Sequence, residues 1–247
     1  AEELFKERSL TSYYDEVALK GLQLAQADAD RGALDIERLM KIRDAVSEFS
    51  HNLADHEDRP PPKVSSTSDA EATSAVESIG EDAGYDVPVL RKEDLPPEWQ
   101  GEHPVLCVAG RTLIDEAAAI MLGQLSTAHG LAARVEGAEA LSTANIFRLE
   151  TAGVAIVCLV YMDKSGPAHM RYSVRRLRRK LPKATIILGC WLKDIEPAAL
   201  EQLREGAKAD LAAATLADAV KLSIESTGLT SRGLKTEQGE LSAMTAA

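Results

Sequence analysis

The sequence predicts a flavodoxin-like, doubly wound α/β domain with a parallel five-stranded sheet over residues 104–228. Two observations predict it. Apolar, β-branched runs alternate strictly with helical patterns, which is the order found in parallel sheets covered by helices on both faces. The run at 154–162 is also apolar throughout, as expected of a strand that is buried on both sides. A helix between two such runs requires a right-handed crossover and a parallel strand pair.

Local signals place each element of this domain. Gly130, Gly153 and Gly228 are expected to end helices, because glycine readily adopts the left-handed conformation found there. A basic helix is expected to start near Ser165, a possible cap, and to end before Pro182. The predicted strand order is 2-1-3-4-5. We expect strands at 105–109, 132–135, 154–162, 184–191 and 209–213, further helices at 113–129, 143–151, 197–208 and 216–227, and a flexible tail at 229–247.

An α-helical hairpin is predicted before this domain, within residues 1–56. Two apolar stripes at helical spacing are separated by Arg31-Gly32, and Asp35 can cap the second helix. Two amphipathic helices cannot bury both stripes alone, so we expect them to pack on each other and on a further surface. The stripes are Leu10, Tyr14, Val17, Ala18, Leu22 and Ala25, and then Leu34, Leu39, Ile42, Val46, Phe49 and Leu53.

The composition of residues 57–103 predicts a disordered acidic, Pro/Ser-rich linker. They carry 4 basic and 12 acidic side chains, include Pro60-Pro61-Pro62, and contain few large apolar residues. Such a segment buries too little apolar surface to offset the entropy of ordering it. Near its end, Val87, Leu90, Leu95 and above all Trp99 are expected to anchor the chain on a domain surface.

Composition limits the class of protein. The chain has 247 residues and a formal net charge of −11, and no apolar run approaches the roughly 18 residues of a membrane span. No signal peptide is expected after Ala1, and the chain is expected to be a piece of a longer protein. Cys107, Cys158 and Cys190 all lie in predicted strands, which favours a reducing cytoplasm without disulfides or a metal cluster.

Residues 1–56 resemble a known family. The segments FKERSL at 5–10, YDEV at 14–17, LQLA at 22–25 and RGALD at 31–35 look like the cytosolic tail after the last membrane span of autoinducer-2 exporter family permeases. Residues 104–228 resemble the additional C-terminal domain of some long proteobacterial members. The resemblance implies a location on the cytoplasmic side of the inner membrane, with the membrane portion of the same permease as a partner. A generic helical hairpin is the alternative.

In doubly wound sheets, ligands bind at the carboxyl ends of the strands. The layout resembles cobalamin-binding domains, but residues 110–115 replace their Asp-x-His-x-x-Gly loop without a histidine to ligate cobalt, and Trp191 would obstruct the corrin tail. Of the residues that a phosphoacceptor receiver needs, Asp163 alone is present, and Thr112 is a weak signal for a flavin phosphate loop. We therefore expect no cofactor and no metal. The ligand-binding candidates at this edge are Gly110, Arg111, Thr112, Asp163, Ser165, Gly166 and Gly189.

No catalytic residue is assigned. The five histidines are scattered, and His129 is expected to complement a helix dipole. His169 lies near Asp163 and Ser165 in sequence, but this set lacks the strand-supported nucleophile turn of acyl-transfer enzymes and reads as a solvated loop.

The basic helix is the most unusual feature of the sequence. Met170, Val174, Leu177 and Leu181 share one face, which is expected to be buried. The opposite face is expected to be an interaction surface for anionic lipid or for the acidic linker, or else simply solvated. Nucleic acid is not expected, because the net charge is negative and the pattern indicates no aromatic residues interleaved with the arginines. The cationic residues are Arg171, Arg175, Arg176, Arg179, Lys180 and Lys183.

The sequence thus predicts a non-enzymatic accessory or regulatory region of a membrane permease or exporter, which acts by protein or lipid interaction and could form homo-oligomers. The alternative is a ligand- or cofactor-binding α/β domain, cobalamin-like or flavin-like, or a small enzyme that uses the carboxyl edge of the sheet.

Overall fold

The computed structural model describes residues 9–54, 87–163 and 166–229, and it confirms the predicted sheet. All strand pairs are parallel, and the order is β2-β1-β3-β4-β5. The predictions for residues 57–86, for Ser165 and for residues 230–247 lie outside the described residues. The strands are β1 Val105–Ala109, β2 Ala133–Glu136, β3 Ile156–Tyr161, β4 Thr185–Cys190 and β5 Leu211–Ala213.

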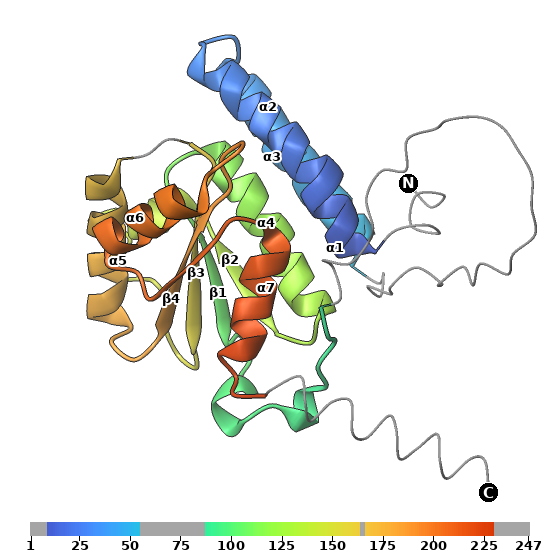
Figure 1. The fold of residues 1–247 in the computed structure, drawn as a ribbon, viewed down its shortest axis with the longest axis vertical. Coiled ribbons are helices and arrows are strands. Elements are labelled where there is room, and N and C mark those ends of the chain that lie inside the picture. Colours follow the sequence, from blue (N-terminus) through green and yellow to red (C-terminus); the bar gives the residue numbers. More distant parts are fainter. Residues whose placement is uncertain (1–8, 55–86, 164–165, 230–247) are drawn as a thin grey trace, which may run out of the picture.

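Helices cover both faces of the sheet (Figure 1). Val105 and Cys107 of β1 face the core under α4 and α7, while Leu106 and Val108 face the core under α5. This alternation follows from the two-residue period of a strand. The helices of the domain are α4 Leu113–Ala128, α5 Pro167–Lys180, α6 Pro197–Ala207 and α7 Leu216–Glu225.

The predicted helix at 143–151 is wrong. The chain forms a short 3₁₀ helix, η5 Ala138–Leu141, followed by turns. Side chains supply the reason, because the Asn145 amide donates to the Glu139 carbonyl at 3.1 Å and the Ser142 hydroxyl accepts from the Asn145 backbone at 3.3 Å. Such local bonds compete with a helix. The apolar residues of the segment, Ile146 and Leu149, are nevertheless buried.

The hairpin packs along α4, which is the further surface expected for its two apolar stripes (Figure 1). Asp35 caps the second helix by accepting from the Arg38 backbone at 2.9 Å. The predicted first stripe is wrong at Val17, which is 45% exposed, while Leu19 is buried. A π-helical turn shifts the phase of the helix there. The elements are α1 Leu10–Tyr13, η2 Tyr14–Ala18, α2 Leu19–Asp30 and α3 Ile36–Asn52.

Asp15, on the π-helical turn, connects the hairpin to the last helix of the domain. Its carboxylate accepts from the backbone of Leu216 at 2.8 Å and of Ala217 at 3.0 Å, at the start of α7. These N–H groups have no partner inside their own helix. A residue of the hairpin therefore completes a helix end some 200 residues later in the chain.

The described end of the predicted linker packs on the domain and is not disordered. Its apolar anchors Val87, Leu90, Leu95 and Trp99 are buried, next to the 3₁₀ turns η3 Lys92–Asp94 and η4 Pro97–Trp99. Their burial offsets the entropy of ordering this acidic segment. In the part of the chain that the structure describes, no helix is both long and apolar enough to cross a membrane.

Candidate functional site

At the carboxyl edge of the sheet, Tyr161 fills the space beside Gly110. A Cβ atom at Gly110 would lie 2.2 Å from Cε1 of the Tyr161 ring, and Tyr161 is fully buried. The Tyr161 hydroxyl donates to the Ser173 hydroxyl at 3.2 Å and lies 3.3 Å from Nδ1 of His169. The glycine therefore accommodates a ring of the protein itself.

Asp115 organises the loop after β1, and the sequence prediction missed it. This buried carboxylate accepts from the backbone of Arg111 at 2.8 Å, of Thr112 at 2.9 Å and of Met162 at 2.6 Å. The Thr112 hydroxyl in turn accepts from the Asp115 backbone at 3.1 Å, which completes a capping box. The signal in the sequence was an acidic residue three positions after Thr112. Thr112 is thus a helix cap.

Arg111 and Asp163 are brought together across the switch between β1 and β3. Their side chains form an ion pair in which Asp163 is almost completely buried and the Arg111 side chain is 58% exposed. Gly166 is exposed at the start of α5, where its carbonyl accepts from His169 at 3.0 Å. The structure thus brings Arg111 and Asp163 together, whereas Gly110 contacts Tyr161 and the Gly166 carbonyl bonds within α5.

Trp191 closes the next position along the edge. A Cβ atom at Gly189 would lie 3.1 Å from Cζ2 of the Trp191 ring, which is fully buried. The Gln23 amide of α2 donates to the Trp191 carbonyl at 3.2 Å, so the hairpin also reaches this edge. Among the described candidates of this edge, Arg111 and Asp163 pair with each other, whereas Gly110, Thr112 and Gly189 contact Tyr161, Asp115 and Trp191 of the domain itself.

The described residues contain no group of three or more histidine, cysteine or acidic side chains placed to hold a metal ion. Cys107 and Cys158 lie opposite each other on β1 and β3, both buried and free. A hydrogen bond to Cys158 and burial raise the pKa of the Cys107 thiol, which favours the unreactive protonated form.

Two buried carboxyls make stability depend on pH. Burial raises the pKa of both Asp15 and Asp115 from 3.8 to about 6, although backbone N–H groups act in the opposite direction. The folded state therefore holds these protons more tightly than the unfolded state. The stability that each proton confers, up to about 3 kcal/mol, is complete below about pH 4 and is lost as the pH rises through about 6.

We expect replacement of both carboxyls by asparagine to remove this contribution to the pH slope between pH 4 and pH 7. Denaturant unfolding of the parent chain and of Asp15→Asn/Asp115→Asn at each pH measures it, with Asp94→Asn, at an exposed position, as control. Identical slopes in the parent and the double variant would show that these carboxyls do not titrate abnormally.

The second candidate site is the cationic surface, defined here as Arg175, Arg179 and Lys183 together with two exposed rings. The Arg175 guanidinium lies 5.8 Å from the centre of the Tyr172 ring, and the Phe147 ring lies beside Lys180. The predicted inner face is confirmed, because Met170, Val174, Leu177 and Leu181 are buried. Arg175, Arg179 and Lys183 are exposed, and among the described residues none of them forms an ion pair. Arg175 and Arg179 lie four residues apart on one side of α5, and Lys183 lies in the turn after the helix ends.

The other predicted cations support the domain itself. Arg171 donates to the Gly206 carbonyl at 2.6 Å. Arg176 donates to the Leu141 carbonyl and to the Thr143 hydroxyl. Lys180 donates to the Phe147 carbonyl at 3.4 Å. Arg178, which was not among the predicted residues, pairs with Asp210 at 2.6 Å.

Two exposed aromatic rings lie among these cations, so one premise for excluding nucleic acid was wrong. The Arg176 guanidinium lies 4.4 Å from the centre of the Tyr172 ring, and the Lys180 ammonium lies 5.2 Å from that of Phe147. Phe147 is 76% exposed and Tyr172 is 43% exposed. Tyr172 was visible in the sequence between Arg171 and Arg175, whereas Phe147 joins the surface only through the fold.

The fold and these sites define a doubly wound α/β domain with a helical hairpin docked on one of its helical layers. No known protein family and no curated protein matches the chain. Among solved structures, it is similar to a cobalamin-binding protein from Desulfitobacterium hafniense DCB-2, with a TM-score of 0.39 and 12% identity. The similarity covers 91% of this chain and 86% of that one. A likeness of this size assigns no ligand, and the exporter resemblance stays a prediction.

Proposed function

We propose that the chain is a non-enzymatic accessory or regulatory domain that docks on an anionic phospholipid surface. The observation that supports this proposal is the cationic surface, where exposed rings and exposed cations lie together. Arginine and lysine attract anionic headgroups, and aromatic rings are favoured at the level of those headgroups. The net charge of −11 opposes the approach, but beyond about 8 Å it is largely screened at physiological salt. Once the domain is in contact with the membrane, the positive charge of the cationic surface therefore outweighs the negative charge of the rest of the chain.

The exporter resemblance of residues 1–56 suggests which membrane surface the domain would bind. A domain attached to the membrane portion of a permease would face the inner leaflet on the cytoplasmic side. The proposal of a permease partner is based on the sequence resemblance, whereas the proposal of lipid binding is based on the exposed cations and rings of the cationic surface. The two can therefore be tested separately.

We expect the chain to co-sediment with vesicles that contain phosphatidylserine and not with vesicles of phosphatidylcholine alone. Arg175→Gln/Arg179→Gln/Lys183→Gln should weaken this binding about 100-fold, since each cation contributes about 1 kcal/mol and 1.4 kcal/mol is a factor of ten. These three residues are chosen because Arg171, Arg176 and Lys180 bond to the domain's own backbone.

The matched control is Lys20→Gln/Lys41→Gln/Lys92→Gln, which removes three exposed charges elsewhere and should bind like the parent chain. Unchanged binding of the α5 variant would refute the proposal. Tighter binding to a single-stranded oligonucleotide than to the charged vesicles would also refute it and would identify nucleic acid as the partner.

A second candidate function is ligand binding by the α/β domain and its hairpin. The observation that favours it is a pocket with aromatic walls between the hairpin and α4. This pocket is separate from the residues at the carboxyl edge of the sheet.

A further inference from the structure

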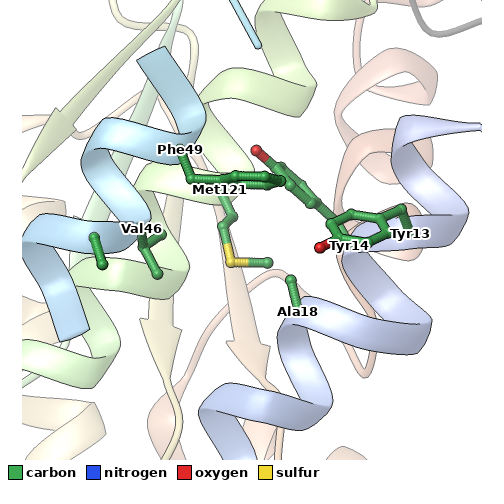
Figure 2. A pocket seen from close by; sticks show the side chains of 7 residues that line it. Tyr13, Tyr14, Ala18, Val46, Phe49 and Met121 are labelled. Carbon is green, nitrogen blue, oxygen red and sulfur yellow. The ribbon is translucent and has the colours of Figure 1, made fainter. Parts of the chain in front are cut away.

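A pocket of about 180 Å³ lies between the two helices of the hairpin and α4 (Figure 2). We call it the hairpin pocket. It lies on the opposite side of the sheet from the cationic surface, so it is independent of lipid docking. Its lining is almost entirely apolar and is drawn from α1, η2, α3 and α4. The lining residues are Tyr13, Tyr14, Ala18, Ala45, Val46, Phe49 and Met121.

The walls of the hairpin pocket are held in place by contacts outside it. The Tyr14 ring is fully buried, and its hydroxyl donates to the Gln124 side chain, with Ser50 3.5 Å away. Burial raises the pKa of Tyr14 to about 12, so its hydroxyl stays a neutral donor. The Phe49 ring lies 5.8 Å from that of Tyr13 and 6.3 Å from that of Tyr14, centre to centre. A ligand would therefore meet rings that are already oriented.

Small residues and the π-helical turn create the space. Packed helices normally fill their contact with interdigitating side chains and leave few voids larger than a water molecule. Here Ala18 and Ala45 face the gap, and the turn at Tyr14–Ala18 directs Val17 outward, where it is exposed. π-Helical turns occur frequently at functional sites. A leucine in place of Ala18 or Ala45 would be expected to fill the gap. The pocket therefore depends on these two small side chains as well as on the arrangement of the helices.

We propose that the hairpin pocket binds an uncharged aromatic ring of benzene to indole size. The volume is of the right size, since an apolar cavity of about 150 Å³ binds benzene, while drug-sized ligands require roughly 300 Å³ or more. The hairpin pocket is open to solvent, because Ala45 in its lining is exposed, so a bound ring would be only partly enclosed. A charged group placed against the apolar lining would lose part of its hydration without finding a polar partner there. Three rings and the Met121 sulfur favour an aromatic ligand over an aliphatic one.

Binding of this ligand stabilises the docked hairpin, because the ligand contacts both hairpin helices and α4 together. A molecule that binds only the folded state stabilises it by RT ln(1 + [L]/Kd), so the unfolding temperature continues to rise with ligand concentration above the Kd. The hairpin pocket therefore couples a small aromatic molecule to the attachment of residues 9–54 to the domain.

Titration of the full chain with benzene and with indole, followed by calorimetry and thermal unfolding, tests this site. We expect saturable 1:1 binding and a rise in unfolding temperature. Ala45→Leu and Ala18→Leu should each lower the affinity at least tenfold, while Ala27→Leu, on an exposed position of α2, should not. Two filling variants are used so that one folded variant is enough for the comparison, which circular dichroism verifies.

The absence of saturable binding by either probe would overturn the proposal, and so would unchanged affinity in a folded filling variant. Cyclohexane should bind more weakly than benzene, because it makes no ring–ring or sulfur–ring contact. Equal affinity of the two would overturn the assignment to aromatic ligands.

Discussion

Replacement of Asp115 by alanine is expected to lower the free energy of unfolding by about 4 kcal/mol at pH 7. The carboxylate accepts from three backbone N–H groups, at Arg111, Thr112 and Met162, and alanine accepts from none. Each donor left buried without a partner costs about 1–3 kcal/mol, with the lower figure for the two at the partly exposed helix start. Denaturant unfolding, read as a change in midpoint at constant slope, measures this loss.

The matched control is Asp218→Ala, which removes the same side chain three residues after the capping Thr215 of α7. There the Thr215 hydroxyl accepts from the Asp218 backbone at 3.0 Å, and the start of α7 is already satisfied by Asp15. We expect Asp218→Ala to cost less than about 1 kcal/mol, as is usual for a carboxylate near a helix N-terminus. Equal losses in the two variants would show that Asp115 acts only through the helix dipole.

Gly130→Ala is expected to destabilise the chain by about 3–5 kcal/mol and to detach the segment that carries Trp99. Gly130 has a φ of +85°, and a Cβ atom there would lie 2.0 Å from the Leu90 carbonyl oxygen. The left-handed conformation by itself costs an alanine about 1–2 kcal/mol. The remainder comes from a contact with backbone, which cannot turn away as a side chain can. Hydrogen exchange of residues 87–100 would report the detachment.

Gly153→Ala is the control for conformation without the clash. Gly153 has a φ of +69°, but nothing lies within 4 Å of its Cβ position. We expect a loss of about 1 kcal/mol and unchanged hydrogen exchange at residues 87–100. If both variants lost the same stability, the contact between Gly130 and Leu90 would contribute nothing.

His129 shows why the segment before the domain is integral to it. Its Nδ1 lies 3.2 Å from the Pro88 carbonyl, and its Nε2 lies 3.1 Å from the Thr11 hydroxyl. The Leu90 backbone also donates to the His129 carbonyl at 3.0 Å. One residue at the end of α4 thus contacts both the hairpin and the end of the predicted linker. The sequence prediction assigned it only to the helix dipole. Its partners could not be found from local pattern, because they lie 41 and 118 residues away in the chain.

Local pattern was sufficient for the sheet, the basic helix and the hairpin. Continuous apolar runs gave β1, β3 and β4, because a strand buried on both faces needs apolar residues at every position. β1 was placed without error, and α5 was placed to within a turn. The buried stripe at Met170, Val174, Leu177 and Leu181 follows from helical periodicity alone. These features depend on residues within a few positions of one another.

Tertiary structure decided everything that depends on residues distant in the chain. The carboxyl edge had the composition of a ligand site, but Tyr161, Trp191 and the ion pair of Arg111 with Asp163 occupy it. The hairpin pocket arises where a π-helical turn, two alanines and α4 meet, and no local pattern contains all three. The physical reason is that periodicity reports which face of an element is buried. It does not report which partner covers that face or what space is left between them, because both depend on the shapes of residues that only the folded chain brings together.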